Sequence, residues 1–216
     1  MKPRLLDAYC CQGGAANGYT DAGFDVTGVD IDPQPRYPYE FIQADALEFI
    51  AAHGHEYDVI HASPPCQDHS PLKSRAGEHG TGWMLQATLD LLPTIGKPYI
   101  VENVMGAQMP RDLVLCGSMF DLRIYRHRKF HIGGVTMLEQ PIHPRHVVKT
   151  ATKKRRRGWD AGMNISVTGD IGTTIGSLAM GIDWMTGDGL SQAIPPLYAE
   201  FIGRQLIERL AIEAAA

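Results

Sequence analysis

A cysteine directly behind two prolines is the strongest chemical signal in this 216-residue sequence. It lies in the run Ser63-Pro-Pro-Cys66-Gln67, which follows an apolar segment typical of a strand, Asp58–Ala62. The prolines restrict the backbone, so they would hold the thiol of Cys66 at the end of that strand. A thiol held rigidly in a polar sequence can act as a nucleophile, whereas most lone cysteines pack in a core. We therefore predict that Cys66 is a nucleophile.

A carboxyl group follows at the end of the next predicted strand, Tyr99–Glu102. Glu102 lies in the run Val101-Glu-Asn-Val104, between apolar residues. Burial raises the pKa of a carboxyl group, which lets it act as an acid near neutral pH. Glu102 could instead be a satisfied polar residue that caps the strand. Beside Cys66, Glu102 would supply a general acid next to a nucleophile.

Three features nearer the N-terminus are typical of a nucleotide-like ligand. Gly13 and Gly14 precede a predicted helix and would let the backbone approach a ligand, although their spacing differs from the G-x-G-x-x-G fingerprint. Asp30 ends the second predicted strand, where a carboxylate can accept hydrogen bonds from ribose hydroxyls. Asp45 follows the third strand, where it either accepts from an exocyclic amine or caps the next helix. Each feature alone also fits an ordinary turn or helix cap.

The elements around these residues alternate between strand and helix, which predicts a doubly wound α/β fold with a mostly parallel, twisted sheet and helices on both faces. In such sheets ligands bind beyond the carboxyl ends of the strands, where all of these side chains fall. The predicted strands are Arg4–Ala8, Asp25–Asp30, Phe41–Gln43, Asp58–Ala62 and Tyr99–Glu102. The predicted helices are Ala15–Ala22, Ala46–His53, Trp83–Leu92, Thr173–Met180 and a C-terminal helix opened by Pro195-Pro196.

Composition narrows the class of protein. Hydrophobic residues make up 44% and charged residues 20%, an ordinary globular mix. No apolar run approaches the roughly 20 residues that span a bilayer, and Asp7 comes too early for a signal peptide, so we expect a cytoplasmic protein without a membrane partner. The four cysteines form no Cys-x-x-Cys pair, and no His-x-x-x-His pair suggests zinc, so the sequence predicts no metal site.

The charge is uneven. The formal net charge is −4, yet a dense basic run lies within a weakly patterned segment from Gly133 to Gly169. Such a run can bind phosphates, or it can be a solvated, flexible arm. The residues expected to contact phosphates are Lys149, Lys153, Lys154, Arg155, Arg156 and Arg157.

Taken together and in order, these motifs resemble the C5-cytosine DNA methyltransferase family. The matching elements are Asp7–Gly14, Asp30, Asp45, Pro65-Cys66-Gln67, Glu102-Asn103-Val104, Arg126-His-Arg128 and Ser191–Pro196. The resemblance covers nearly the whole chain except about 133–169. It implies a Rossmann-like, S-adenosylmethionine-dependent methyltransferase fold with a minimal target-recognition insertion.

The resemblance also implies a reaction on a cytosine flipped out of double-stranded DNA. Cys66 would add to carbon 6 while Glu102 assists at ring nitrogen 3, and carbon 5 would take the methyl group of S-adenosylmethionine. Arg128, with Arg126, would orient the base and the cysteine, and the segment 68–82 would form a lid. Gln67 and Ser70 would contact the DNA.

The same resemblance implies roles in binding the cofactor. Tyr9 and Ile31 would contact the adenine, Asp45 its amine and Asp30 the ribose hydroxyls. Gly13 and Gly14 would admit the methionine end, and Pro65 and Gln192 would complete the pocket. The chain would divide into a catalytic domain of residues 1–132, a basic recognition insertion of 133–169 and C-terminal helices of 170–216, acting as a monomer.

Three positions depart from the family pattern: Cys11 replaces a glycine, Ile124 a glutamine and Gln192 an asparagine. None removes a group that the reaction needs, but they leave open a modified adenosylmethionine as donor. The sequence is also compatible with a nucleotide acceptor, with a non-catalytic DNA-binding relative and with a cysteine-dependent hydrolase. For the hydrolase, neither His61 nor His69 is an obvious base.

Overall fold

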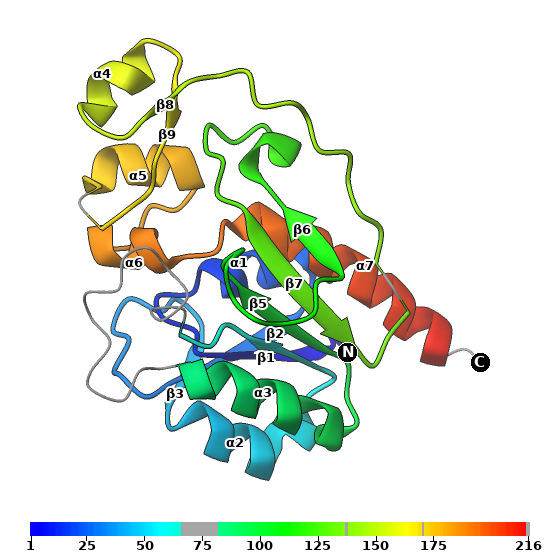
Figure 1. The fold of residues 1–216 in the computed structure, drawn as a ribbon. Helices are drawn as coiled ribbons and strands as arrows, with labels where there is room; N and C mark the ends of the chain where they lie inside the picture. Colours follow the sequence, from blue (N-terminus) through cyan, green and yellow to red (C-terminus); the bar gives the residue numbers. More distant parts are fainter. Residues whose placement is uncertain (66–81, 137, 170, 215–216) are drawn as a thin grey trace.

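The centre of the computed structural model, which describes residues 1–65, 82–136, 138–169 and 171–214, is a seven-stranded sheet (Figure 1). Its order is β3-β2-β1-β4-β5-β7-β6. The strands β1 to β5 pair in parallel, and β7 pairs antiparallel with both β5 and β6. The strands are β1 (Arg4–Ala8), β2 (Asp25–Asp30), β3 (Glu40–Gln43), β4 (Val59–Ala62), β5 (Tyr99–Asn103), β6 (Leu113–Leu115) and β7 (Arg128–Gly133).

The inner strands are buried on both faces because their side chains alternate between two cores. Leu5 packs in the core that contains α1 and α7, whereas Leu6 packs in the core with α2 and α3. Both leucines are fully buried, as expected for a parallel sheet covered by helices on each face. The helices are α1 (Gly14–Ala22), α2 (Ala46–His53), α3 (Gly82–Ile95) and α7 (Pro196–Ala214), with short 3₁₀ turns η1 (Gly54–Glu56) and η3 (Gly117–Phe120).

Helices α1 and α7 approach each other closely through a glycine. A Cβ atom built on Gly18 would lie 2.0 Å from the backbone oxygen of Pro196, at the start of α7. The C-terminal helix is therefore seated directly on the helix that follows the first strand.

Residues 150–193 form a separate unit at one end of the sheet (Figure 1). Its core includes Ile165, Ile175 and Leu190, and it also takes in Ile124 from the strand connection before β7. A segment without helix or strand, 138–149, leads to this unit from the sheet. Its elements are β8 (Thr150–Ala151), α4 (Arg155–Asp160), β9 (Asn164–Ile165), α5 (Thr173–Met180) and α6 (Gly187–Gln192).

The predicted α/β fold class is confirmed, and so are the five predicted strands and the predicted helices. The sequence analysis did not predict β6, β7, β8, α4, β9 or α6. Because the core of the 150–193 unit includes residues from both sides of position 170, the boundary at 169/170 in the predicted division stays a proposal. Among the described helices, none combines the length and apolar composition needed to cross a membrane.

Candidate active site

The turn after β1 is tightly wound and is fixed to the end of β2. Tyr9, Cys11 and Gly13 all have positive φ, of 58°, 45° and 84°. The backbone N–H of Cys11 donates to Oδ2 of Asp30 at 2.9 Å, and Oδ1 of Asp30 accepts from the N–H of Asp32 at 3.0 Å. The carboxylate of Asp30 therefore sets the distance between the turn and the second strand, at the carboxyl edge of the sheet.

The C-terminal segment closes over the same turn. A Cβ atom on Gly14 would lie 2.6 Å from the backbone oxygen of Ile194, so only glycine allows this approach without movement. The Sγ atom of Cys11 lies 3.5 Å from Oε1 of Gln192. Two of the three positions that depart from the family pattern, Cys11 and Gln192, are thus in contact with each other.

Three residues that the sequence analysis missed strengthen this closure. The side chain of Gln12 accepts a hydrogen bond from the N–H of Thr186 at 2.9 Å and donates to its hydroxyl at 3.1 Å. The backbone oxygen of Gln12 accepts from the indole of Trp184 at 2.8 Å. Gln12 is the residue between Cys11 and Gly13, but only the fold could reveal partners more than 170 positions away.

The predicted adenine-binding residues gather at the ends of β1, β2 and β3. The side chain of Ile31 is 65% exposed, an apolar surface next to Asp30. The hydroxyl of Tyr9 lies 3.1 Å from the hydroxyl of Thr88. Burial raises the pKa of Tyr9, and the nearby charge of Asp45 raises it further.

Asp45 caps the helix α2. Its Oδ1 atom accepts from the N–H groups of Leu47 at 2.9 Å and Glu48 at 3.0 Å, so the helix-cap interpretation is correct. Both bonds use Oδ1, and Oδ2 takes part in neither. The geometry is therefore compatible with an amine bound at the second oxygen.

Glu102 is buried at the carboxyl end of β5 and is paired with an arginine. Its Oε1 atom lies 2.9 Å from Nε of Arg128, the first residue of β7. Burial raises the pKa of Glu102, while the charges of Arg128 and Arg126 and a hydrogen bond from Ser63 oppose that rise. The net shift is upward, which favours a carboxyl group that can carry a proton at the site.

A buried hydrogen-bonded chain leads to Glu102 from the opposite side. His61 is fully buried, with Nδ1 2.9 Å from the hydroxyl of Tyr19 and Nε2 2.8 Å from the hydroxyl of Ser63. Burial lowers the pKa of His61 to about 3, so the imidazole is neutral. One tautomer satisfies the whole chain: Tyr19 donates to Nδ1, Nε2–H donates to Ser63, and Ser63 donates to Glu102. His61 therefore supports the site structurally and is no free base.

Asn103 links the carboxyl motif to the proline-cysteine motif. Its Nδ2 atom donates to the backbone oxygen of Pro64 at 3.1 Å, and its Oδ1 atom accepts from the N–H of Val104 at 2.9 Å. The backbone two residues before Cys66 is thus tied to β5, next to Glu102. Pro65 is partly buried at this edge, whereas Cys66, Gln67, Ser70 and the predicted lid up to residue 81 lie outside the described residues.

The two arginines of the Arg-His-Arg motif have different partners. Arg128 pairs with Glu102, whereas the guanidinium of Arg126 donates to the backbone oxygens of Val167 and Ser191. Arg126 therefore joins the 150–193 unit to the sheet, and its charge also opposes the rise in the pKa of Glu102.

A cavity of about 540 Å³ lies between this edge of the sheet and the 150–193 unit. Both arginines of the motif line it, together with Val104, Met105 and Ser166. The cavity therefore borders the residue that pairs with Glu102.

The basic residues that were predicted to contact phosphates differ in the partners of their side chains. Arg155 is part of the structure, because it donates to the backbone oxygen of Ser166 at 2.9 Å and to the hydroxyl of Thr168 at 2.8 Å. Arg156 pairs with Asp160 at 3.3 Å on the surface of α4. The remaining predicted residues are exposed to solvent: Lys149, Lys153, Lys154 and Arg157.

No protein-family model and no curated protein matches the sequence. Solved structures with a similar fold include a protein described as a DNA modification methyltransferase encoded within an E. coli prophage, with a TM-score of 0.63 and 14% identity over 97% of this chain and 100% of that one. Dnmt2 of S. pombe has a TM-score of 0.64 and 11% identity over 96% and 99% of the two chains. A DNMT2 mutant of Spodoptera frugiperda has a TM-score of 0.60 and 10% identity over the same shares.

These similarities extend over nearly the whole of each chain. The chain therefore has the fold of the S-adenosylmethionine-dependent methyltransferases. The similar structures include a protein described as a DNA modification methyltransferase, the class of protein that the order of the sequence motifs resembles.

Proposed function

We propose that this protein is a DNA cytosine-C5 methyltransferase that uses Cys66 as its nucleophile. The observation that carries the proposal is the junction at the carboxyl ends of β4 and β5. There the buried Glu102 pairs with Arg128, and Asn103 holds the backbone of Pro64, two residues before Cys66. A carboxyl group of raised pKa and a cation therefore lie at the edge of the sheet where the described chain leads to Cys66, the proposed nucleophile.

The chain's own groups can carry the steps at the base. The Cys66 thiolate would add to carbon 6 of a flipped-out cytosine, while Glu102 donates a proton or hydrogen bond to ring nitrogen 3. The addition makes carbon 5 nucleophilic; loss of the carbon-5 proton after methylation then expels the thiolate. Arg128 positions Glu102, and the chain of Tyr19, His61 and Ser63 holds it from the other side.

The residues at the other strand ends fit S-adenosylmethionine, which would supply an electrophilic methyl group. Because Gly14 has no side chain, the C-terminal segment can lie directly against the first turn. The carboxylate oxygens of Asp30 could accept hydrogen bonds from ribose hydroxyls. Exposed Ile31 and the Oδ2 atom of Asp45 suit the face and the amine of adenine. Tyr9, Gly13, Pro65 and Gln192 would complete the pocket.

Double-stranded DNA is the acceptor that the charge pattern favours. The four exposed basic residues, Lys149, Lys153, Lys154 and Arg157, belong to the part of the chain next to the cavity by Arg128. Their positive charges suit phosphate contacts, which position DNA without reading its sequence. We assign the recognition role to residues 133–169, acting with the core that they share with 171–193.

Product analysis tests the proposal. The protein is incubated with duplex DNA and adenosylmethionine, and the digested DNA is analysed by mass spectrometry. We expect 5-methylcytosine with the wild type and with Cys10→Ala, a matched control at a buried cysteine, and none with Cys66→Ala. Bound adenosylmethionine without a DNA product would indicate another acceptor or donor, and failure to bind the cofactor would contradict the proposal.

A further inference from the structure

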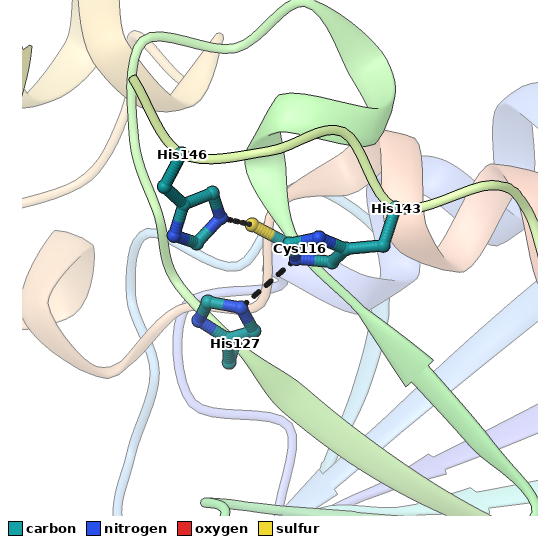
Figure 2. A group of neighbouring side chains, drawn as sticks. All are labelled: Cys116, His127, His143 and His146. Atoms are coloured by element: carbon teal, nitrogen blue, oxygen red, sulfur yellow. Dashed lines mark hydrogen bonds between the residues drawn. The ribbon is translucent and has the colours of Figure 1, made fainter. Parts of the chain in front are cut away.

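Four potential metal ligands converge where β6 ends and β7 begins, beside the segment that carries Arg126 and Arg128. They are one cysteine and three histidines, whose side chains point toward one another (Figure 2). The sulfur and one nitrogen of each ring all lie within 4.8 Å of one another. The four residues are Cys116, His127, His143 and His146.

Two of the four come from the paired strands. Leu115 at the end of β6 lies opposite Arg128 at the start of β7 in an antiparallel ladder, so one further step places Cys116 opposite His127. Cys116 is fully buried and precedes the 3₁₀ turn η3. The strand pairing therefore fixes the first two side chains before any ligand binds.

The other two come from the irregular segment 138–149, in the run His143-Pro-Arg-His146. The ring of Tyr125 stacks on His146, with 3.7 Å between the ring centres and 17° between the planes. The hydroxyl of Tyr125 also donates to the backbone oxygen of Val148 and accepts from its N–H, both at 3.0 Å. These contacts hold the segment that carries His143 and His146 next to Cys116 and His127.

Two spacings between ligand atoms are close to those around a small tetrahedral cation, and the others are at most 4.8 Å. The sulfur of Cys116 lies 3.3 Å from Nε2 of His146, and Nε2 of His127 lies 3.1 Å from Nε2 of His143. In a tetrahedral zinc site, bonds of about 2.0–2.3 Å place neighbouring ligand atoms about 3.3–3.7 Å apart. Hydrogen bonds alone would join these side chains only in two pairs, whereas a metal ion would join all four.

We propose that Cys116, His127, His143 and His146 bind one zinc ion. A thiolate and three imidazoles form a donor set that zinc prefers, whereas calcium and magnesium prefer oxygen. Four protein ligands leave no open position, so the site is structural. The prediction that the chain has no metal site is therefore replaced by this proposal. No sequence motif indicated the site, because its ligands come from three separate segments that match no zinc motif.

The ion would hold the irregular segment to the sheet. Ile142 and Val147 are 92% and 77% exposed, so burial of these apolar side chains contributes little to holding that segment in place. His127 also lies between Arg126 and Arg128, so the ion would fix the backbone that presents the partner of Glu102. The inference goes beyond the proposed reaction and does not depend on it.

Metal analysis of the purified full-length protein, expressed with zinc and kept reduced, tests the site. We expect about one zinc per chain in the wild type, as a closed four-ligand site requires. The variants Cys116→Ser and His143→Ala/His146→Ala should retain less than about a tenth of that amount, because each loses part of the donor set. His53→Ala is the matched control, since His53 is paired with Glu56 on the surface at 2.8 Å.

Cobalt provides a second readout that does not use activity. Replacing zinc with Co²⁺ should produce the visible absorption of a tetrahedral cobalt site and a thiolate-to-cobalt band, and Cys116→Ser should abolish that band. Removal of the metal should speed hydrogen exchange in 138–149 while leaving β1 to β5 unchanged. A folded wild type that takes up no zinc or cobalt, or a Cys116→Ser variant that keeps both metals at the wild-type level, would overturn the proposal.

Discussion

The central sheet and the 150–193 unit are stabilised in different ways. The sheet buries apolar side chains on both faces; Leu5, Leu6, Ile60 and Ile100 are all fully buried. The 150–193 unit also has an apolar core, but its strands are only two residues long, and arginines that bind backbone oxygens join its segments. Arg123, for example, donates to the backbone oxygens of Trp159 at 2.7 Å and Met163 at 2.8 Å and stacks on the Trp159 ring.

This difference has a functional consequence. In the sheet, the pairing of β5 with β7 sets the positions of Glu102 and Asn103, and Asn103 holds the backbone of Pro64, so the proposed chemistry rests on a rigid frame. In the unit, a few polar side chains set the position of the exposed basic residues. We expect substitutions in the two regions to produce separable losses, of chemistry in one and of DNA binding in the other.

The largest expected effect is on the chemistry. Glu102→Gln keeps the size of the side chain but removes the proton that the carboxyl group would donate. We expect kcat to fall about 10²- to 10⁴-fold, the usual contribution of a general acid. Cofactor binding, measured by calorimetry, should be unchanged because Glu102 is not among the proposed cofactor residues. An unchanged kcat would exclude Glu102 as the acid.

The next effect is on the packing of α1 against α7, beside the sheet. Gly18→Ala forces a Cβ atom onto the backbone oxygen of Pro196, 2.0 Å away, so α1 and α7 must separate. We expect a loss of about 3 kcal/mol in the free energy of unfolding, measured by urea denaturation. Gly169→Ala is the control, because none of the described atoms lies within 4 Å of its Cβ position. Equal stability of the two variants would contradict the close packing of the helices.

The pH dependence of stability tests the buried chain at His61. The folded protein keeps His61 neutral down to about pH 3, whereas an unfolded histidine takes up a proton near its ordinary pKa of about 6.5. Below about pH 6.5 the unfolded state therefore binds more protons, and stability should fall until about pH 3. The loss is on the order of 4 kcal/mol over that window.

A comparison with His61→Gln isolates this contribution, because the buried carboxyl groups are present in both proteins. Urea denaturation at several pH values should show a smaller loss of stability on acidification in the variant. Parallel curves for the two proteins would mean that His61 is protonated in the folded state.

A smaller and more local effect is expected at Arg126. Arg126→Met keeps the alkyl chain but leaves the backbone oxygens of Val167 and Ser191 without this donor. We expect a cost of about 2 kcal/mol, seen as faster hydrogen exchange in 150–193 but not in β1 to β5. Arg204→Met, which removes an exposed pair with Glu200 on α7, is the control. Equal acceleration in both regions would show that they unfold as one unit.

The smallest effects are on DNA binding. Alanine at Lys153, Lys154 or Arg157 should reduce the slope of log K against log salt by about one each, because each side chain would release one counterion. Arg156→Ala should reduce it less, since Asp160 already pairs with that arginine. Fluorescence anisotropy at several salt concentrations measures the slopes, with Lys2→Ala as control. An equal change of slope in all four variants would contradict the distinction between Arg156, which is paired with Asp160, and the other three basic residues.

Sequence reasoning worked best where local pattern and tertiary structure agree. The strands β1 to β5 are short runs separated by helices or, between β2 and β3, by a loop, so the sequence pattern alone located them and placed Glu102 and Asp30 on one edge. It missed β6 and β7, because their antiparallel pairing depends on contacts between distant segments. The partners of Gln12 and the convergence of Cys116 with three histidines were hidden for the same reason. A residue type indicates possible chemistry, but only the fold shows which residues meet.

The most direct test of the central claim is covalent trapping. A duplex that carries 5-fluorocytosine at target positions is incubated with the protein and adenosylmethionine, and the product is digested and sequenced by mass spectrometry. Fluorine at carbon 5 cannot leave as a proton does, so the enzyme should remain bound to carbon 6. We expect one adduct, on the peptide that contains Cys66, absent in Cys66→Ala and retained in Cys10→Ala. An adduct on another residue, or methylated product without any adduct to cysteine, would contradict the central claim.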